Sequence, residues 1–505
     1  MKHKLIIMTI CLVFFSLTAY AAEESPSKGD KKIPEASVIT TQHEIRIDGQ
    51  LIKYTASAGT LLMTNENDEP TALIGFTAYV RDGGDPGKRP IMFAYNGGPG
   101  SASLWLHMGI LGPQRAVAAD TGFGDNGPFQ RVDNEFSIID EVDLVMIDPV
   151  GTGFSKPVGK GKGKDFWGVD QDISSVSAFI VKYVTENGRW ASPKFVLGES
   201  YGGIRTGGVA YYLLSNHMMA LNGVVLVSPF MEMATGFSGM GIDLPHVLFL
   251  PTFATTAWYH DALDVKPEDF LAFNAEVEAF ALDEYAPALL KGSRLNSDER
   301  QTILTKLARY TGISEDYWDS ANLRINEGRF TQELLRQRGI TVGRVDSRFS
   351  GEMVNGLAES AFYDPMTTAI GPAYLAAFMD YYYNDLNVKN ASEYVVFANI
   401  FTDWDWSHRQ PDIQGFKLPF PNTSIDLAFT MKQNPSMKVL VQQGYFDLAT
   451  PHLTTKYYLD HMNISAELRE NITLEMYEAG HMMYIHEPSM AKYKKDLKRF
   501  IKESY

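Results

Sequence analysis

Cysteine is nearly absent from this sequence, since Cys11 is the only one among 505 residues. The chain can form no intrachain disulfide, so its packed core alone must hold the fold together. The sequence also lacks clustered cysteine and histidine residues and a His-Glu-x-x-His motif, which are typical of zinc sites. We therefore expect no catalytic metal and no cofactor.

Positive charge is scarce as well. Lysine and arginine number 45 against 61 aspartate and glutamate residues, which gives a formal net charge of −16. A chain of this charge repels phosphate backbones, so we expect no nucleic-acid partner.

Long apolar runs are missing except near the N-terminus. Residues 1–21 combine a basic start, a short apolar run and Ala19-Tyr20-Ala21, which places small residues where a signal peptidase cleaves. A buried helix or a membrane anchor is the alternative, but the run is short for a bilayer span and no second run of that length follows. We expect residues 1–21 to be a signal peptide and residues 22–42 a flexible leader. The mature protein would be periplasmic or secreted, without a membrane anchor.

What the sequence does contain is an alternation of strand and helix patterns. Residues 43–230 begin with the alternation of an antiparallel meander and continue with apolar strands separated by helical periodicity. Residues 231–375 are helical and acidic, and strand patterns return in residues 376–505. The pattern predicts an α/β fold with a mostly parallel central sheet flanked by helices, in which residues 231–375 form a helical cap inserted between two parts of one core.

A serine bracketed by glycines lies in LGESYGG, residues 197–203. The motif G-x-S-x-G is short enough to occur by chance, but here a strand precedes it and a helix follows. This strand–turn–helix context presents a serine as a nucleophile, which predicts Ser200 as the catalytic serine.

The partners of such a serine follow it along the chain, first an acid and then a histidine. Asp447 comes after the strand VLVQQGYF and His481 after LEMYEAG, so both should lie at the same sheet edge as Ser200. Ser200 would attack a carbonyl, His481 would transfer its proton, and Asp447 would orient the imidazole. A turn aspartate and a structural histidine are the alternatives.

The tetrahedral oxyanion requires two positioned N–H donors. The first is the amide of Tyr201, the residue after the nucleophile. The second is expected in NGGPG, residues 96–100, which follows the strand IMFAY. A simple tight turn is the alternative for this loop.

Four stretches together resemble one family. NGGPG, the segment GPFQRVDNEFSIIDEVDLVMIDPVGTGFS (residues 127–155), GESYGG and the late GHM resemble the serine carboxypeptidases, the carboxypeptidase Y and cathepsin A group of α/β-hydrolases. The likeness is closer to the exported bacterial members. It implies the α/β-hydrolase fold and an enzyme that releases C-terminal residues from peptides through an acyl-enzyme.

The resemblance also implies roles for further residues. Asn96 and Glu199 would bind the C-terminal carboxylate of the substrate, and we call this pair the carboxylate clamp. Gly98 and Tyr201 would supply the oxyanion amides, and Met482 would line the pocket of the leaving residue. Because two carboxylates within hydrogen-bond distance must share a proton, Glu199 would act as a protonated acid, and hydrolysis should be best in acidic solution.

The sequence departs from the family pattern near the clamp. Ala94 replaces a tryptophan that shapes the carboxylate site, and Ser101 replaces a disulfide cysteine. A second glutamate of the family falls on Ile110, which makes the clamp thinner. His107 is a candidate substitute, with a half-buried helix histidine as the alternative.

Two other functions stay open. An acyltransferase or esterase on the same scaffold would pass the acyl group to an alcohol or act on esters, and the thinner clamp favours it slightly. A catalytically inactive binding protein is disfavoured by the complete set of Ser200, Asp447 and His481. Peptides are the expected partners, and a homodimer is left open.

Overall fold

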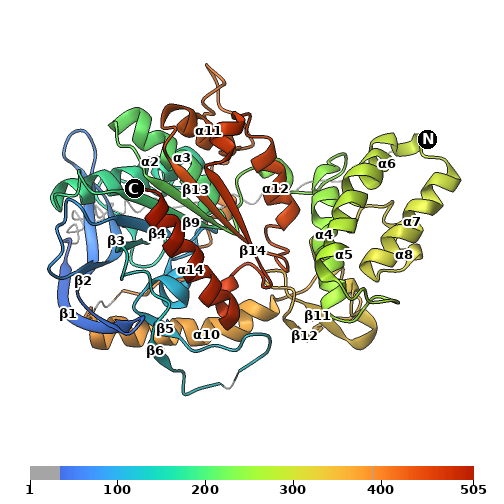
Figure 1. Ribbon diagram of the computed structural model, residues 1–505, viewed down its shortest axis with the longest axis horizontal. Helices are drawn as coiled ribbons and strands as arrows, with labels where there is room; N and C mark the ends of the chain where they lie inside the picture. The colour runs from blue at the N-terminus through green and yellow to red at the C-terminus, as the bar shows by residue number, and fades with distance from the viewer. Residues whose placement is uncertain (1–34, 125, 390–391) are drawn as a thin grey trace, which may run out of the picture. The chain divides into compact units, whose positions relative to one another are not determined.

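A single large sheet forms the centre of this chain. The computed structural model describes residues 35–124, 126–389 and 392–505. Within these ranges the strands run in the order β1-β2-β3-β7-β4-β9-β10-β13-β14, with β8 paired to β3 (Figure 1). The strand bounds are β1 (Val38–Ile47), β2 (Gln50–Thr64), β3 (Pro70–Arg81), β4 (Ile91–Tyr95), β7 (Asp143–Ile147), β8 (Lys156–Pro157), β9 (Lys194–Glu199), β10 (Gly223–Val227), β13 (Lys438–Gly444) and β14 (Ile472–Tyr477).

The sheet is antiparallel at its start and parallel elsewhere. β1, β2 and β3 form the predicted meander, whereas β7, β4, β9, β10, β13 and β14 run parallel to one another. β1 begins at Val38, inside the segment 22–42 that the sequence assigned to a leader. This strand lies at the sheet edge and every second residue of it is exposed, so its apolar signal is weak. The expected signal peptide, residues 1–21, lies outside the described residues.

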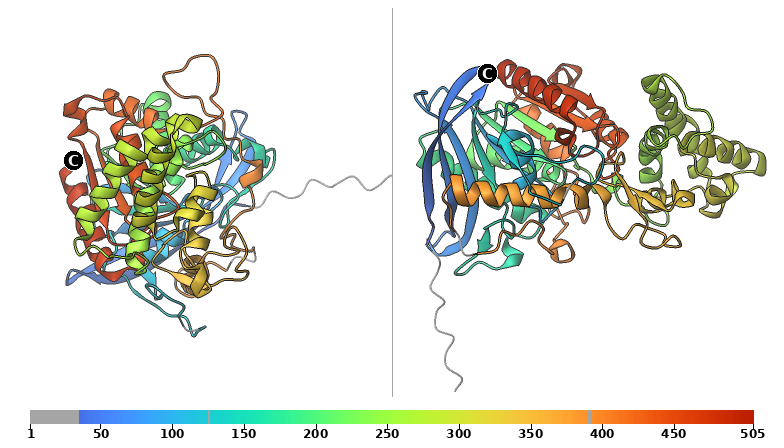
Figure 2. Two further views of the ribbon diagram at one scale, coloured as in Figure 1. Left: turned by 90° about the vertical axis from the view of Figure 1, so that its right-hand side faces the viewer. Right: turned by 90° about the horizontal axis from the view of Figure 1, so that it is seen from below.

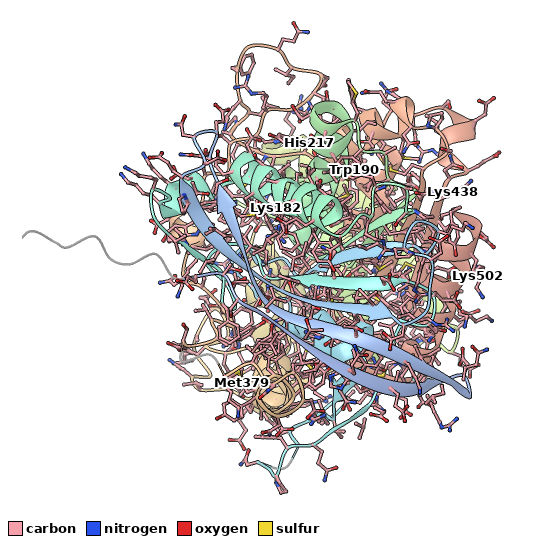
Figure 3. The ribbon with its side chains drawn as sticks, turned by 90° about the vertical axis from the view of Figure 1, so that its left-hand side faces the viewer. Lys182, Trp190, His217, Met379, Lys438 and Lys502 are labelled. Atoms are coloured by element: carbon pink, nitrogen blue, oxygen red, sulfur yellow. The ribbon has the colours of Figure 1, made fainter. Side chains whose placement is uncertain are left out.

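Helices cover both faces of the sheet. In β4, Met92 and Ala94 pack into one core and Ile91 and Phe93 into the other, as alternation along a strand requires. Figure 3 shows Lys182 and His217 on the helices of one face and Met379 on a helix of the other. The first face carries α2 (Val169–Glu186), α3 (Gly202–His217), α11 (Ser424–Gln433) and α12 (His452–Asp460), and the second carries α1 (Leu104–Leu106), α10 (Pro365–Asp380) and α14 (Glu487–Glu503).

This arrangement confirms the predicted α/β fold with a mostly parallel sheet between helical layers. Among the helices in the described ranges, none is both long enough and apolar enough to cross a membrane. The smaller elements are the hairpin of β5 (Gln114–Ala116) and β6 (Arg131–Asp133) and the short α13 (Ala466–Arg469).

A second group of helices has its own hydrophobic core and stands beside the sheet (Figures 1 and 2). It consists of α4 (Leu244–Tyr259), α5 (Phe270–Phe280), α6 (Ala286–Lys291), α7 (Ser297–Thr311), α8 (Glu315–Ser320) and α9 (Glu327–Glu333). A hairpin of β11 (Ile340–Val342) and β12 (Ser350–Glu352) follows. We call residues 244–352 the cap.

The cap differs in extent from the insertion 231–375 expected from the sequence. α10 crosses the boundary placed at residue 375, and its Met366, Ile370 and Tyr374 pack into the core of the sheet. Leu448 and Leu453, which follow β13, pack into the core of the cap instead. The segment after β13 is therefore shared by both parts of the molecule.

Candidate active site

Ser200 lies on a sharp turn between β9 and α3. Its φ is 62°, in the left-handed region that residues with a side chain rarely adopt. The turn is held by a 3.0 Å hydrogen bond from Ser200 N to the carbonyl of Val227 and by bonds from Gly203 N and Phe230 N to the Ser200 carbonyl, at 2.8 and 2.9 Å. A Cβ at Gly198 would clash with the Gly202 carbonyl, so strand and helix approach closely only because this residue is glycine.

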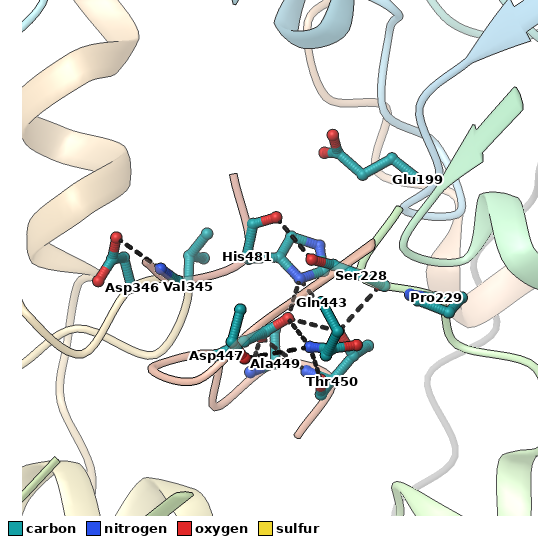
Figure 4. Close-up of polar contacts among 12 residues, drawn as sticks. Glu199, Ser228, Pro229, Val345, Asp346, Gln443, Asp447, Ala449, Thr450 and His481 are labelled. Atoms are coloured by element: carbon teal, nitrogen blue, oxygen red, sulfur yellow. Dashed lines mark hydrogen bonds and ion pairs between the residues drawn. The ribbon is translucent and has the colours of Figure 1, made fainter. Parts of the chain in front are cut away.

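Asp447 and His481 meet at the same sheet edge. His481 Nδ1 lies 2.8 Å from Asp447 Oδ2, and both side chains are buried (Figure 4). Asp447 Oδ1 accepts hydrogen bonds from the amides of Ala449 and Thr450, at 2.8 and 2.9 Å. The Thr450 hydroxyl donates to Asp447 Oδ2 at 2.7 Å. These donors fix the carboxylate toward Nδ1, so Nε2 is the nitrogen left for a proton from Ser200.

The charge of Asp447 acts on His481. Burial lowers the pKa of His481, but the negative charge of Asp447 and their hydrogen bond more than offset this, so the pKa lies above its usual value of 6.5. The Ser228 hydroxyl also donates to the His481 carbonyl at 2.7 Å and holds the loop in place.

The predicted oxyanion donors lie beside Ser200. Gly98 and Tyr201 line the same pocket as Ser200 and His481. Across the described ranges, neither backbone amide donates to any other group of the protein. A Cβ at Gly97 would lie 2.5 Å from Tyr201 N, which shows how closely the NGGPG loop packs on the turn. Two backbone amides are thus available where negative charge would develop on a bound carbonyl.

Glu199 and Asn96 form a buried pair. Asn96 Nδ2 donates to Glu199 Oε1 at 2.8 Å, and Asn96 Oδ1 accepts from the amide of Leu106 at 3.0 Å. The hydroxyl of Tyr484 donates to the other oxygen, Glu199 Oε2, at 2.7 Å. Burial is the main cause that raises the pKa of Glu199 to about 7, against the opposing effects of His481, Tyr484 and Asn96.

A model of the family described as serine carboxypeptidase matches residues 75–484. The chain belongs to the serine carboxypeptidase family. Like that family, it is a serine-type hydrolase that releases C-terminal residues from peptides. Comparison with curated proteins gave no match.

Two solved structures are similar to this serine carboxypeptidase, and the first shares its fold. Kex1(delta)p, a prohormone-processing carboxypeptidase from Saccharomyces cerevisiae, has a TM-score of 0.54 at 15% identity over 88% of this chain and 91% of that chain. A proline iminopeptidase from Mycobacterium smegmatis has a TM-score of 0.38 at 14% identity over 88% of this chain and 98% of that chain.

The departures from the family pattern have structural consequences in this serine carboxypeptidase. Ala94 is fully buried in β4, and Ile110 is a buried residue of the hydrophobic core. His107 bonds to the hydroxyl of Tyr79 at 2.6 Å, and burial lowers its pKa to about 3. It is a neutral core histidine that does not bond to Glu199. The hydrogen-bonding partner of Glu199 that the sequence did not predict is Tyr484.

One pocket of about 480 Å³ joins these groups. Met482, expected in the pocket of the leaving residue, lines it. Aromatic side chains from several loops also line it, among them Phe230, Phe237 and Trp406. Among the residues that the structure describes, Arg344 is the only arginine or lysine in the lining, and Glu327 from the start of α9 contributes an acid in addition to Glu199. A pocket of this volume accommodates a small number of residues of a peptide.

Proposed function

We propose that Ser200, His481 and Asp447 act as the catalytic triad of this carboxypeptidase. Ser200 Oγ attacks the carbonyl of the last peptide bond while His481 Nε2 accepts its proton. His481 then donates this proton to the leaving amine, the C–N bond breaks, and the released residue departs. Water, deprotonated by His481, hydrolyses the acyl-enzyme and regenerates Ser200. The amides of Gly98 and Tyr201 stabilise the oxyanion in both steps.

The observation that carries the exopeptidase proposal is the Asn96–Glu199 pair next to Ser200. A negatively charged glutamate beside Ser200 would repel the oxyanion. A protonated Glu199 instead donates a hydrogen bond to the terminal carboxylate of a substrate. Burial favours this protonated form, because it raises the pKa of Glu199 to about 7. The clamp thus selects peptides with a free C-terminus and works best below neutral pH.

We also propose that the protein is exported. The N-terminal sequence and the lack of disulfide-forming cysteines favour export to a bacterial periplasm or beyond the cell. Peptides are abundant substrates in such a compartment.

Two matched peptides test the function. One has a free C-terminal carboxylate and the other is amidated, and each is incubated with the mature chain between pH 4 and pH 8 and followed by mass spectrometry. Stepwise trimming of the free-acid peptide alone, best in acid, is expected. Equal cleavage of both peptides, or hydrolysis of a simple ester with neither peptide cleaved, would favour an esterase, and excess alcohol acceptor identifies an acyltransferase.

A further inference from the structure

Tyr484 contacts the clamp from beyond the catalytic histidine. It lies three residues after His481, in the helical turn Met483–Ile485, and its ring is fully buried. We propose that Tyr484 is a positioning residue for Glu199: its hydroxyl fixes the carboxyl group that faces the substrate and limits the pH range over which free-acid peptides bind. This inference rests on the proposed function of the clamp.

The hydrogen bonds of the clamp leave one direction for the proton of Glu199. Oε1 accepts from Asn96 Nδ2 and Oε2 accepts from Tyr484, so each oxygen already has a donor. Asn96 presents its Nδ2 donor to Glu199, and its Oδ1 accepts from the amide of Leu106 instead, so Asn96 offers Glu199 a donor and not an acceptor. A protonated Glu199 therefore directs its O–H toward the pocket, where a substrate carboxylate accepts it.

Several ionisable groups face Glu199 from the elements around it. His481 comes from the loop after β14 and Asp447 from the loop after β13. Tyr374 comes from α10, Tyr493 from α14, and Tyr484 from the turn Met483–Ile485. Of the three tyrosines, Tyr484 is the one that hydrogen-bonds to Glu199. A donor to a carboxylate favours the charged form, so Tyr484 opposes the effect of burial and lowers the pKa of Glu199.

The test compares two tyrosine-to-phenylalanine variants. Tyr484→Phe removes the donor to Glu199, whereas Tyr493→Phe removes a buried hydroxyl that has no hydrogen-bond partner in the described structure. For each variant, kcat/KM is measured from pH 4 to pH 9 on a free-acid peptide and on its ester. Thermal unfolding of both variants checks that they fold.

Tyr484→Phe should move the alkaline limb of the free-acid profile upward by about one pH unit, because Glu199 then stays protonated to higher pH. KM for the free-acid peptide at pH 5 should rise several-fold, since the carboxyl group is less firmly held. The ester profile and the Tyr493→Phe profiles should not move. If Tyr484→Phe folds and the alkaline limb of its free-acid profile does not shift, the inference is overturned. If the wild type does not prefer free-acid peptides, the proposed function itself is overturned.

An independent observation concerns Arg344, which lines the pocket from the cap. Its backbone is fixed, because its amide donates to Asp364 Oδ2 at 2.7 Å and its carbonyl accepts from Leu448 N at 3.1 Å. In the part of the chain that the structure describes, its guanidinium makes no hydrogen bond or ion pair with another side chain. Arg344 is exposed to solvent, and its positive charge lies close enough to His481 to act toward a lower pKa of that histidine.

We infer that Arg344 is a specificity-determining residue that binds an acidic side chain next to the scissile bond. Carboxylates are the groups that a guanidinium binds best, through two parallel hydrogen bonds. The net charge of −16 makes the chain as a whole repel acidic peptides, so a lone cation in the pocket provides local attraction for them. The inference rests on the proposed function.

Blocked dipeptides with glutamate, glutamine or lysine at either position test this role. The wild type should prefer glutamate over glutamine at one of the two positions. Arg344→Ala should lower kcat/KM for that glutamate peptide about tenfold and leave the glutamine peptide unchanged, and Arg344→Glu should favour lysine. Arg329→Ala, which removes an exposed cap arginine outside the pocket lining, is the control. Equal losses on glutamate and glutamine peptides, or no preference in the wild type, would overturn the assignment.

Discussion

The backbone N–H of His481 donates a 2.8 Å hydrogen bond to the carbonyl oxygen of Val345. This bond joins the loop after β14 to the cap, and we call residues 344–348 the cap strap. Asp346, the next residue of the strap, accepts a bond of 3.1 Å from the amide of Gly480 (Figure 4). The position of His481 thus depends on the cap as well as on the sheet.

The first prediction concerns Asp346, which is fully buried and pairs with Arg348 at 2.7 Å. Asp346→Ala leaves the buried Arg348 with Asp120 as its remaining charged partner and removes the acceptor of Gly480 N. We expect the free energy of unfolding to fall by about 3 kcal/mol and kcat to fall about tenfold or more with little change in KM. Urea denaturation and steady-state kinetics measure these effects, with the exposed cap variant Asp264→Ala as control. If the free energy of unfolding falls as expected while kcat is unchanged, the strap does not position His481.

The second prediction concerns the triad. Ser200→Ala and His481→Ala should each lower kcat by about 10⁴-fold or more, and the double variant should be no worse than either single one. A fluorophosphonate probe should label the wild type and leave Ser200→Ala unlabelled. Additive losses in the double variant would mean that the two residues do not act as a unit.

The third prediction concerns the activity of Glu199→Gln. An amide cannot lose a proton, so the alkaline limb near pH 7 of free-acid peptide cleavage should disappear. Cleavage of free acids at pH 5 should fall about tenfold or more, because an amide N–H is a weaker donor to the substrate carboxylate than a carboxylic acid that shares its proton. Ester hydrolysis should change little at any pH. If both substrate classes fall equally, Glu199 is structural.

The fourth prediction concerns stability and pH. The pKa of Glu199 rises from its ordinary value of 4.5 to about 7 on folding. Between these values the folded chain holds a proton that the unfolded chain has released, so the free energy of unfolding falls as pH rises through this range. Across this range, the titration of Glu199 lowers the free energy of unfolding by about 3 kcal/mol. Urea unfolding at pH 5 and pH 8 should show a smaller pH dependence for Glu199→Gln than for the wild type, and parallel curves would contradict the burial argument.

The sequence was informative where local pattern determines structure. Ser200, Asp447 and His481 each follow a strand, and parallel strands bring their carboxyl ends to one edge, so order along the chain was sufficient to group them. The alternation of apolar residues likewise predicted the antiparallel start and the two-faced core.

Other features depend on contacts that no local pattern encodes. Tyr484 and Glu199 are 285 positions apart, and a tyrosine after GHMM looks like any core aromatic. Asp346 and Gly480 are 134 positions apart, and nothing in the cap sequence indicates that one of its loops contacts the catalytic histidine. Such pairs are determined by how the cap and the sheet pack together, which periodicity does not report.

The cap strap has a consequence for protein engineering. Because residues 344–348 bond directly to the loops of Asp447 and His481, a chimera that imports a whole foreign cap would also replace the support of its own catalytic histidine. Helices α4 to α9 end at Glu333, before the strap begins. A graft that stops there would exchange the helices beside the pocket and keep the native strap, with its hydrogen bonds to the loops of Asp447 and His481. This junction is therefore the best position at which to combine segments of related enzymes.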